Sequence, residues 1–249
     1  MKKKYFSIIF LALIYIATFI TKDPSVKVMN QFLNTGGNHK EEKQIVIVID
    51  PGHGGRDPGK VGINNTLEKD INLSIALKLK KLLQQNDMKV IMTRDADVGL
   101  YSDTDSNKKA ADMNERVRII KDNEADLAVS IHQNSYSQEY VKGAQVFYYT
   151  QSQQGKEMAE IIQNQLKKSI DNNNNRQAKA NNSYYMLRKT ECPLVIVECG
   201  YLTNYSESAL LLQEDYQEKM AFAIHLGIMR YLNEKGKDSF RSETVALNK

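Results

Sequence analysis

Three side chains suited to metal binding or acid–base chemistry each follow a short apolar run of this 249-residue chain: His53, His132 and Glu198. If the runs are parallel strands, their carboxyl ends meet at one edge of a sheet, which is where open α/β folds bind ligands. Glu68 opens a helical pattern that returns from the glycine-rich turn DPGHGG, and it is able to reach the same edge. We therefore expect residues that are far apart in the sequence to converge on one site.

Two imidazoles and one carboxylate, with a fourth position open to water, form the ligand set of a catalytic zinc site. A second carboxylate is then left to take a proton from the water and pass it to a leaving group. The sequence contains neither the helix motif H-E-x-x-H nor a cysteine-rich zinc pattern. Spacing alone therefore leaves metal binding and a purely structural interpretation both open.

For each of these residues considered alone, a purely structural role explains its presence. The glycines supply positive φ angles to a tight turn, a histidine at a strand end is often a hydrogen-bonded core residue, and the helix dipole favours Glu68 in a first turn. Glu198 is the exception, because a carboxylate that ends the run Leu-Val-Ile-Val is costly to bury without a partner. Four such residues at one sheet edge favour a functional site.

The elements that must position these residues alternate between apolar strands and periodic helices. Strands are expected at 45–49, 88–92, 127–131, 144–149 and 194–198, and helices at 67–83, 110–123, 155–170 and 216–232. This order predicts a single α/β domain with a mostly parallel, twisted sheet flanked by helices. The strand at 144–149 follows its predecessor too closely for a crossover helix, so we expect it to be an antiparallel edge strand. Polar loops are expected at 99–109 and 171–182.

The ends of the chain differ in character from this domain. Residues 1–22 begin Met-Lys-Lys-Lys and continue into an apolar run, which is typical of a signal peptide or an uncleaved membrane anchor. We interpret residues 23–43 as a linker, 44–234 as the catalytic domain and 235–249 as a polar tail. The leader predicts a protein that is exported across the bacterial cytoplasmic membrane or anchored to it.

Charge and composition exclude several classes of protein. The net charge of +4 comes entirely from Lys2, Lys3, Lys4 and Lys22 in the leader, so no basic face for nucleic acid is expected. Apolar residues make up 41% and charged residues 26% of the chain, which excludes intrinsic disorder and collagen. Cys192 and Cys199 would lie about 20 Å apart in an extended strand, well beyond disulfide reach, so two free thiols are expected.

Six segments in order carry a family resemblance: DPGHGG, LEKDINL, MTR, ADLAVSIHQNS, GAQVFYY and PLVIVECGYLTN. Together they resemble the zinc-dependent N-acetylmuramoyl-L-alanine amidases of the Amidase_3 family, across residues 44–233. The chain is most similar to the sporulation- and germination-associated, CwlD-like branch. The resemblance implies that His53, Glu68 and His132 bind Zn²⁺ and that Glu198 is the catalytic carboxylate.

The resemblance also implies a substrate, a place and a partner. The substrate is the peptidoglycan amide between N-acetylmuramic acid and L-alanine. Members of this branch act in forming spore-cortex muramic-δ-lactam, which places the protein in the cell wall or the forespore intermembrane space. In some relatives the activity depends on a wall-associated lipoprotein partner.

Three further residues match positions of the family pattern and are candidate substrate contacts: Arg94, Asn134 and Arg188. An arginine offers a planar fork to peptide carboxylates, although a surface ion pair explains each arginine equally well. Ser135 stands where many members have alanine.

Two other functions stay open, a zinc peptidase acting on another wall amide and a metal-free wall-binding module. His225 shares an apolar helical stripe, so we expect it to be a packed core residue.

Overall fold

The computed structural model describes residues 44–63 and 65–247. The leader and the linker predicted for residues 1–43 lie outside the described residues. Within the described ranges, no helix has both the length and the apolar character needed to cross a membrane.

The described residues form one six-stranded sheet with the order β2-β1-β3-β6-β4-β5. Its strands are β1 (Val46–Pro51), β2 (Lys89–Met92), β3 (Leu127–Asn134), β4 (Gln145–Tyr149), β5 (Lys179–Asn181) and β6 (Leu194–Tyr201). The four strands from β2 to β6 pair in parallel, whereas β4 runs antiparallel to β6. The prediction of a single α/β domain with a mostly parallel sheet is confirmed.

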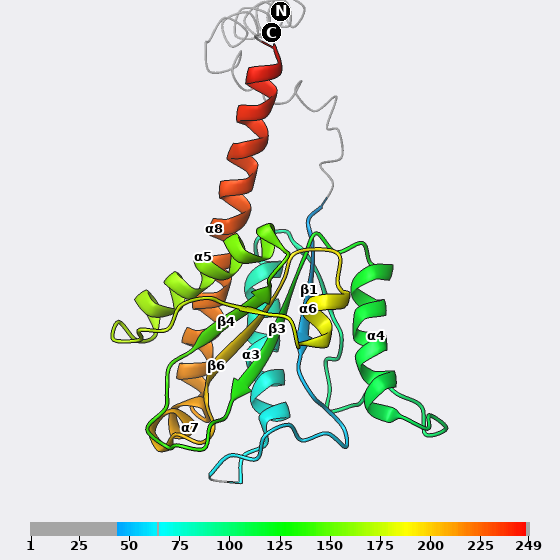
Figure 1. The fold of residues 1–249 in the computed structure, drawn as a ribbon, viewed down its shortest axis with the longest axis vertical. Helices are drawn as coiled ribbons and strands as arrows, with labels where there is room; N and C mark the ends of the chain where they lie inside the picture. Colours follow the sequence, from blue (N-terminus) through cyan, green and yellow to red (C-terminus); the bar gives the residue numbers. More distant parts are fainter. Residues whose placement is uncertain (1–43, 64, 248–249) are drawn as a thin grey trace, which may run out of the picture. The chain divides into compact units, whose positions relative to one another are not determined.

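Helices cover both faces of the sheet, so the fold has three layers (Figure 1). One face packs against α3 (Glu68–Gln84), α5 (Gln153–Ser169) and α8 (Glu214–Leu247), and the other against α4 (Lys108–Asp122) and α6 (Tyr185–Lys189). A further short helix, α7 (Tyr205–Leu211), follows β6. Because both faces are covered, β1 and β6 are buried along their whole length, as their unbroken apolar sequences predict.

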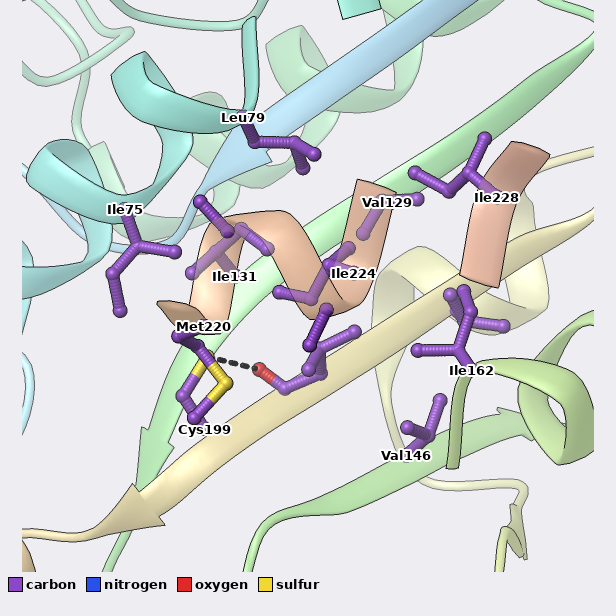
Figure 2. Packing of buried hydrophobic residues seen from close by; sticks show 14 of the residues in the cluster. Ile75, Leu79, Val129, Ile131, Val146, Ile162, Cys199, Met220, Ile224 and Ile228 are labelled. Atoms are coloured by element: carbon purple, nitrogen blue, oxygen red, sulfur yellow. Dashed lines mark hydrogen bonds between the residues drawn. The ribbon is translucent and has the colours of Figure 1, made fainter. Parts of the chain in front are cut away.

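The larger core lies between the sheet and the three helices α3, α5 and α8. Figure 2 shows Ile75 and Leu79 of α3 meeting Ile131 of β3, with Ile224 of α8 between the layers. Full burial of an aliphatic side chain of this size contributes about 2 kcal/mol. Cys199 belongs to the same cluster, and neither cysteine is in a disulfide, as expected. This packing makes the sheet a rigid support for the residues at its carboxyl edge.

One prediction about the sheet is wrong, and the last helix is longer than the predicted range of 216–232. The strand at 144–149 is antiparallel as expected, but it is not the edge, because β5 pairs with it from within the loop predicted at 171–182. The predicted polar tail is helical as far as Leu247, as a continuation of α8. The apolar stripe of α8 ends near Leu232. A helix can continue past the point where its apolar face stops packing against the core. Ion pairs from Arg230 to Glu234 and from Lys235 to Glu157 of α5 continue past that point.

Candidate metal centre

The turn after β1 presents His53 in an unusual backbone conformation. His53 has φ 64°, in the left-handed region that non-glycine residues rarely adopt. Gly52, just before it, lies against the imidazole of His132, and a Cβ atom there would come within 2.1 Å of that ring. The glycine-rich turn therefore has a defined purpose, since it lets two histidines from different strands approach each other.

Glu68, the first residue of α3, joins these two histidines. Its Oε2 lies 3.2 Å from Nε2 of His53, and its Oε1 lies 3.0 Å from Nδ1 of His132. The two imidazole rings meet edge to face with centroids 5.0 Å apart. One ligand atom from each of the three residues lies within 4.8 Å of the others.

This geometry fits a zinc ion. Zinc binds imidazole nitrogen and carboxylate oxygen at about 2.0–2.2 Å in a tetrahedron, which separates neighbouring ligand atoms by about 3.3 Å. Each histidine nitrogen lies close to that distance from a different oxygen of Glu68, 3.2 Å from Oε2 for His53 and 3.0 Å from Oε1 for His132. The donor set of two nitrogens and one oxygen also leaves a fourth position open, as in catalytic zinc sites.

A second carboxylate, Asp57, orients the first histidine. Its Oδ2 lies 2.8 Å from Nδ1 of His53, which leaves Nε2 turned toward Glu68. Carboxylate partners of this kind fix the tautomer and the ring direction of metal-binding histidines. Sequence reasoning missed Asp57, although a carboxylate shortly after a candidate ligand in the same turn was an available signal.

The electrostatics of the cluster favour a cation. Burial by itself would raise the pKa of Glu68, but hydrogen bonds from His132 and His53 hold it far below its usual range. Burial would lower the pKa of His53, yet the carboxylates of Glu68 and Asp57 raise it to about 9. Backbone N–H groups of Gln133 and Lys60 also donate to Glu68 and stabilise its charged form. The histidines thus face a fixed negative charge that a divalent ion would neutralise.

Glu198 lies beside this cluster on the neighbouring strand, where it pairs with His132 in the β3–β6 register. Its side chain is 6% exposed. Oε1 lies 3.4 Å from the hydroxyl of Tyr184, and the buried Oε2 has no hydrogen-bond partner among the described residues. Burial, assisted by the charge of Glu68 and opposed by that of His132, raises the pKa of Glu198 to about 7. A carboxyl group with this pKa is suited to exchange protons near neutral pH.

A cavity of about 370 Å³ opens over the cluster, lined among others by His53, His132, Glu198, Tyr184, Tyr185 and Met186. Tyr184 packs edge to face on Phe147 of β4. Its hydroxyl also reaches Oε1 of Glu198, a contact that nothing in the sequence pattern indicated. The cavity gives a substrate access to the ligand cluster and to Glu198 together.

The structure does not support a substrate contact for Arg94. This residue is 3% exposed, and its guanidinium donates to the backbone carbonyls of Pro51, Gly52, Lys69 and Ala96. Because these carbonyls accept the hydrogen bonds of the guanidinium, Arg94 stabilises the backbone of the turn and does not contact a ligand.

The other two candidate contacts lie outside the group of residues that lines the cavity. Asn134 ends β3, where its side chain accepts a hydrogen bond from the N–H of Ser135. Arg188 is exposed on α6. His225, by contrast, is 8% exposed in the core and stacks on Phe222, as expected.

The chain matches the sequence profile of the Amidase_3 family, described as N-acetylmuramoyl-L-alanine amidase, over residues 47–230. It belongs to this family. The amidase is 39% identical over 194 residues to the germination-specific N-acetylmuramoyl-L-alanine amidase of Bacillus subtilis, a match that covers 77% of this chain and 81% of the relative.

Solved structures agree with this assignment. The amidase is 41% identical, with a TM-score of 0.74, to the CwlD amidase of Clostridioides difficile, solved in complex with the GerS lipoprotein; the match covers 76% of this chain and 99% of that one. It is 35% identical, with a TM-score of 0.67, to the amidase AmiC2 of Nostoc punctiforme, over 76% and 97% of the two chains.

The family assignment fixes the general function. The protein is an N-acetylmuramoyl-L-alanine amidase, its substrate is peptidoglycan, and its location is extracellular or wall-associated. The amidase activity predicted from the sequence is confirmed, and the alternative of a catalytically silent wall-binding module is not supported.

Proposed function

We propose that this enzyme is a zinc amidase of spore-cortex maturation, in which it releases stem peptides from muramic acid on the way to muramic-δ-lactam. The observation that carries the proposal is the cluster of His53, Glu68 and His132 with Glu198 beside it in one cavity. The assignment to the cortex is supported by the similarity to the germination-specific amidase of B. subtilis and to CwlD.

In this proposal His53 Nε2, Glu68 and His132 hold the zinc ion, and Asp57 keeps the His53 ring in place. A bound zinc ion would supply Lewis-acid polarisation of the scissile carbonyl and would lower the pKa of a water molecule. Glu198 then has the acid–base role. Its unpartnered Oε2 accepts the proton of the attacking water and returns it to the nitrogen of L-alanine as the amide bond breaks.

The burial of Glu198 supports this role. A carboxylate at pKa about 7 holds and releases a proton at comparable cost near neutral pH, which is what a group that acts first as base and then as acid needs. Tyr184 approaches the other carboxylate oxygen and so leaves Oε2 as the reactive one. The products are a free lactyl carboxylate on the glycan and a free amino terminus on the stem peptide.

We further propose that a wall-associated lipoprotein assists this enzyme and that residues 1–22 bring it to the membrane. The first proposal is supported by the relative that was solved with a lipoprotein. The second is supported by the lysine-rich start and apolar run of the leader. Zinc content and products measured with and without co-expressed wall lipoproteins test the partner.

Digestion of purified peptidoglycan with the full chain tests the reaction itself. The proposal predicts new free L-alanine amino termini on intact stem peptides, together with zinc in the purified protein. New termini within the stem or the crosslink would instead indicate the zinc peptidase.

A further inference from the structure

Arg116, in the middle of α4, is a buried cation whose hydrogen bonds converge on the turn that carries His53. The residue is 2% exposed. Its Nη1 donates to Oδ1 of Asp50 at 2.6 Å and to the carbonyl of Pro51 at 2.8 Å. Its Nη2 donates to the carbonyl of His53 at 2.7 Å. One planar group therefore spans the chain from the end of β1 to the first metal ligand.

The contact with the His53 carbonyl acts on a strained residue. A non-glycine residue in the left-handed region is strained and persists only where its surroundings hold it. Asp57 contacts the imidazole of His53, whereas Arg116 contacts its backbone. These two contacts together fix the direction in which Nε2 points toward Glu68.

Two carboxylates hold Arg116 itself in place. Asp50 is 1% exposed and also accepts hydrogen bonds from the hydroxyls of Ser130 and Thr93. Asp112, one turn earlier on α4, accepts from Nε of Arg116 at 2.6 Å. The guanidinium is thus fixed from both sides, as a group that sets the position of another residue must be.

We propose that Arg116 is a positioning residue for the metal centre, which holds the backbone of His53 in its metal-binding conformation and thereby sets the affinity for zinc. This inference rests on the proposed zinc site. It assigns Arg116 no contact with substrate or metal. Its effect on the centre passes through His53.

The test measures the affinity of the full chain for Zn²⁺, purified in detergent, by competition with a chromogenic chelator. Arg116→Lys keeps the charge opposite Asp50 but cannot reach Asp50 and the His53 carbonyl at once. Loss of a group that orients a metal ligand typically weakens binding by about 10–100-fold, and that is the expected result. Arg118→Lys is the matched control, because Arg118 lies on the same helix and pairs with Glu115 and Asp122 at the surface.

A double-mutant cycle separates positioning from a general structural effect. In a His53→Ala background, Arg116→Lys should change the residual zinc affinity little, because the ligand through which it acts is gone. Equal weakening in both backgrounds would overturn the proposal, and so would unchanged affinity in Arg116→Lys alone. If the unmodified chain binds no zinc, the proposed zinc site itself fails, which is a different outcome.

If circular dichroism shows that Arg116→Lys does not fold, Asp112→Asn is the second variant that tests the proposal. Its amide oxygen can still accept the N–H of Leu100, as Oδ1 of Asp112 does, while the charged partner of Arg116 Nε is lost. A smaller weakening of zinc binding is expected, again only when His53 is present. Unchanged affinity in this variant would contradict the proposed role.

Discussion

His132 and Glu198 are direct neighbours across the parallel β3–β6 pair, so a proposed metal ligand and the proposed general base stand on adjacent strands of the sheet. Glu198→Gln preserves the shape of the side chain but removes its proton-accepting oxygen. Turnover should fall by at least about 100-fold, because a positioned general base contributes that much or more. Zinc content, measured by elemental analysis, should stay at the level of the unmodified enzyme.

His53→Ala is the companion variant, and it should lose turnover and bind zinc much more weakly than the unmodified enzyme. Equal residual activity in the unmodified enzyme, Glu198→Gln and His53→Ala would reject both roles.

The contact between Asp57 and His53 predicts a change in metal affinity. Asp57→Asn should weaken zinc binding by about 10-fold, because an uncharged partner orients the His53 ring less firmly. Asp95→Asn is a suitable control, since Asp95 is an exposed carboxylate in a nearby loop. Isothermal titration with Zn²⁺ checks the difference, and identical affinities for the two variants would show that Asp57 has no orienting role.

Gly52 provides a steric test of the same centre. In Gly52→Ala the new Cβ would overlap the imidazole of His132, which must then move away from Glu68. We expect loss of zinc and activity in a protein that keeps its circular dichroism spectrum.

Gly236→Ala is the matched change on α8, where a Cβ meets nothing within 4 Å. It should keep activity and stabilise the fold by about 0.5–1 kcal/mol, because alanine is the better helix former. Full activity in Gly52→Ala would contradict the packing described here.

The buried pair of Asp50 and Arg116 predicts a dependence of stability on pH. Burial alone would raise the pKa of Asp50, but Arg116 and the hydroxyls of Ser130 and Thr93 lower it to about 2. A depressed carboxyl pKa stabilises the fold above the unfolded value near 4, and that stabilisation is lost as the pH falls toward 2. Its size is roughly 2 kcal/mol. Denaturant unfolding of the unmodified enzyme and Asp50→Asn between pH 4 and 2 checks this, and the variant should show the shallower slope.

The convergence of His53, His132 and Glu198 could be predicted because parallel strands place their carboxyl ends at one edge whatever the details of packing. Glu68 followed from its place at the start of α3. The orienting residues could not be found in this way. Nothing in the sequence distinguishes Arg94 and Arg116 from other arginines. Their roles follow from the backbone carbonyls of the turn at 50–53 to which they donate hydrogen bonds. The helix beyond residue 235 was missed because hydrophobic periodicity reports packing rather than helicity.

The most direct test of the zinc centre is an anomalous difference map, recorded at the zinc absorption edge from crystals of the full chain grown in detergent. The account predicts one peak between Nε2 of His53, the carboxylate of Glu68 and the ring of His132. The absence of a peak there after soaking with Zn²⁺, or a single peak elsewhere on the molecule, would contradict it.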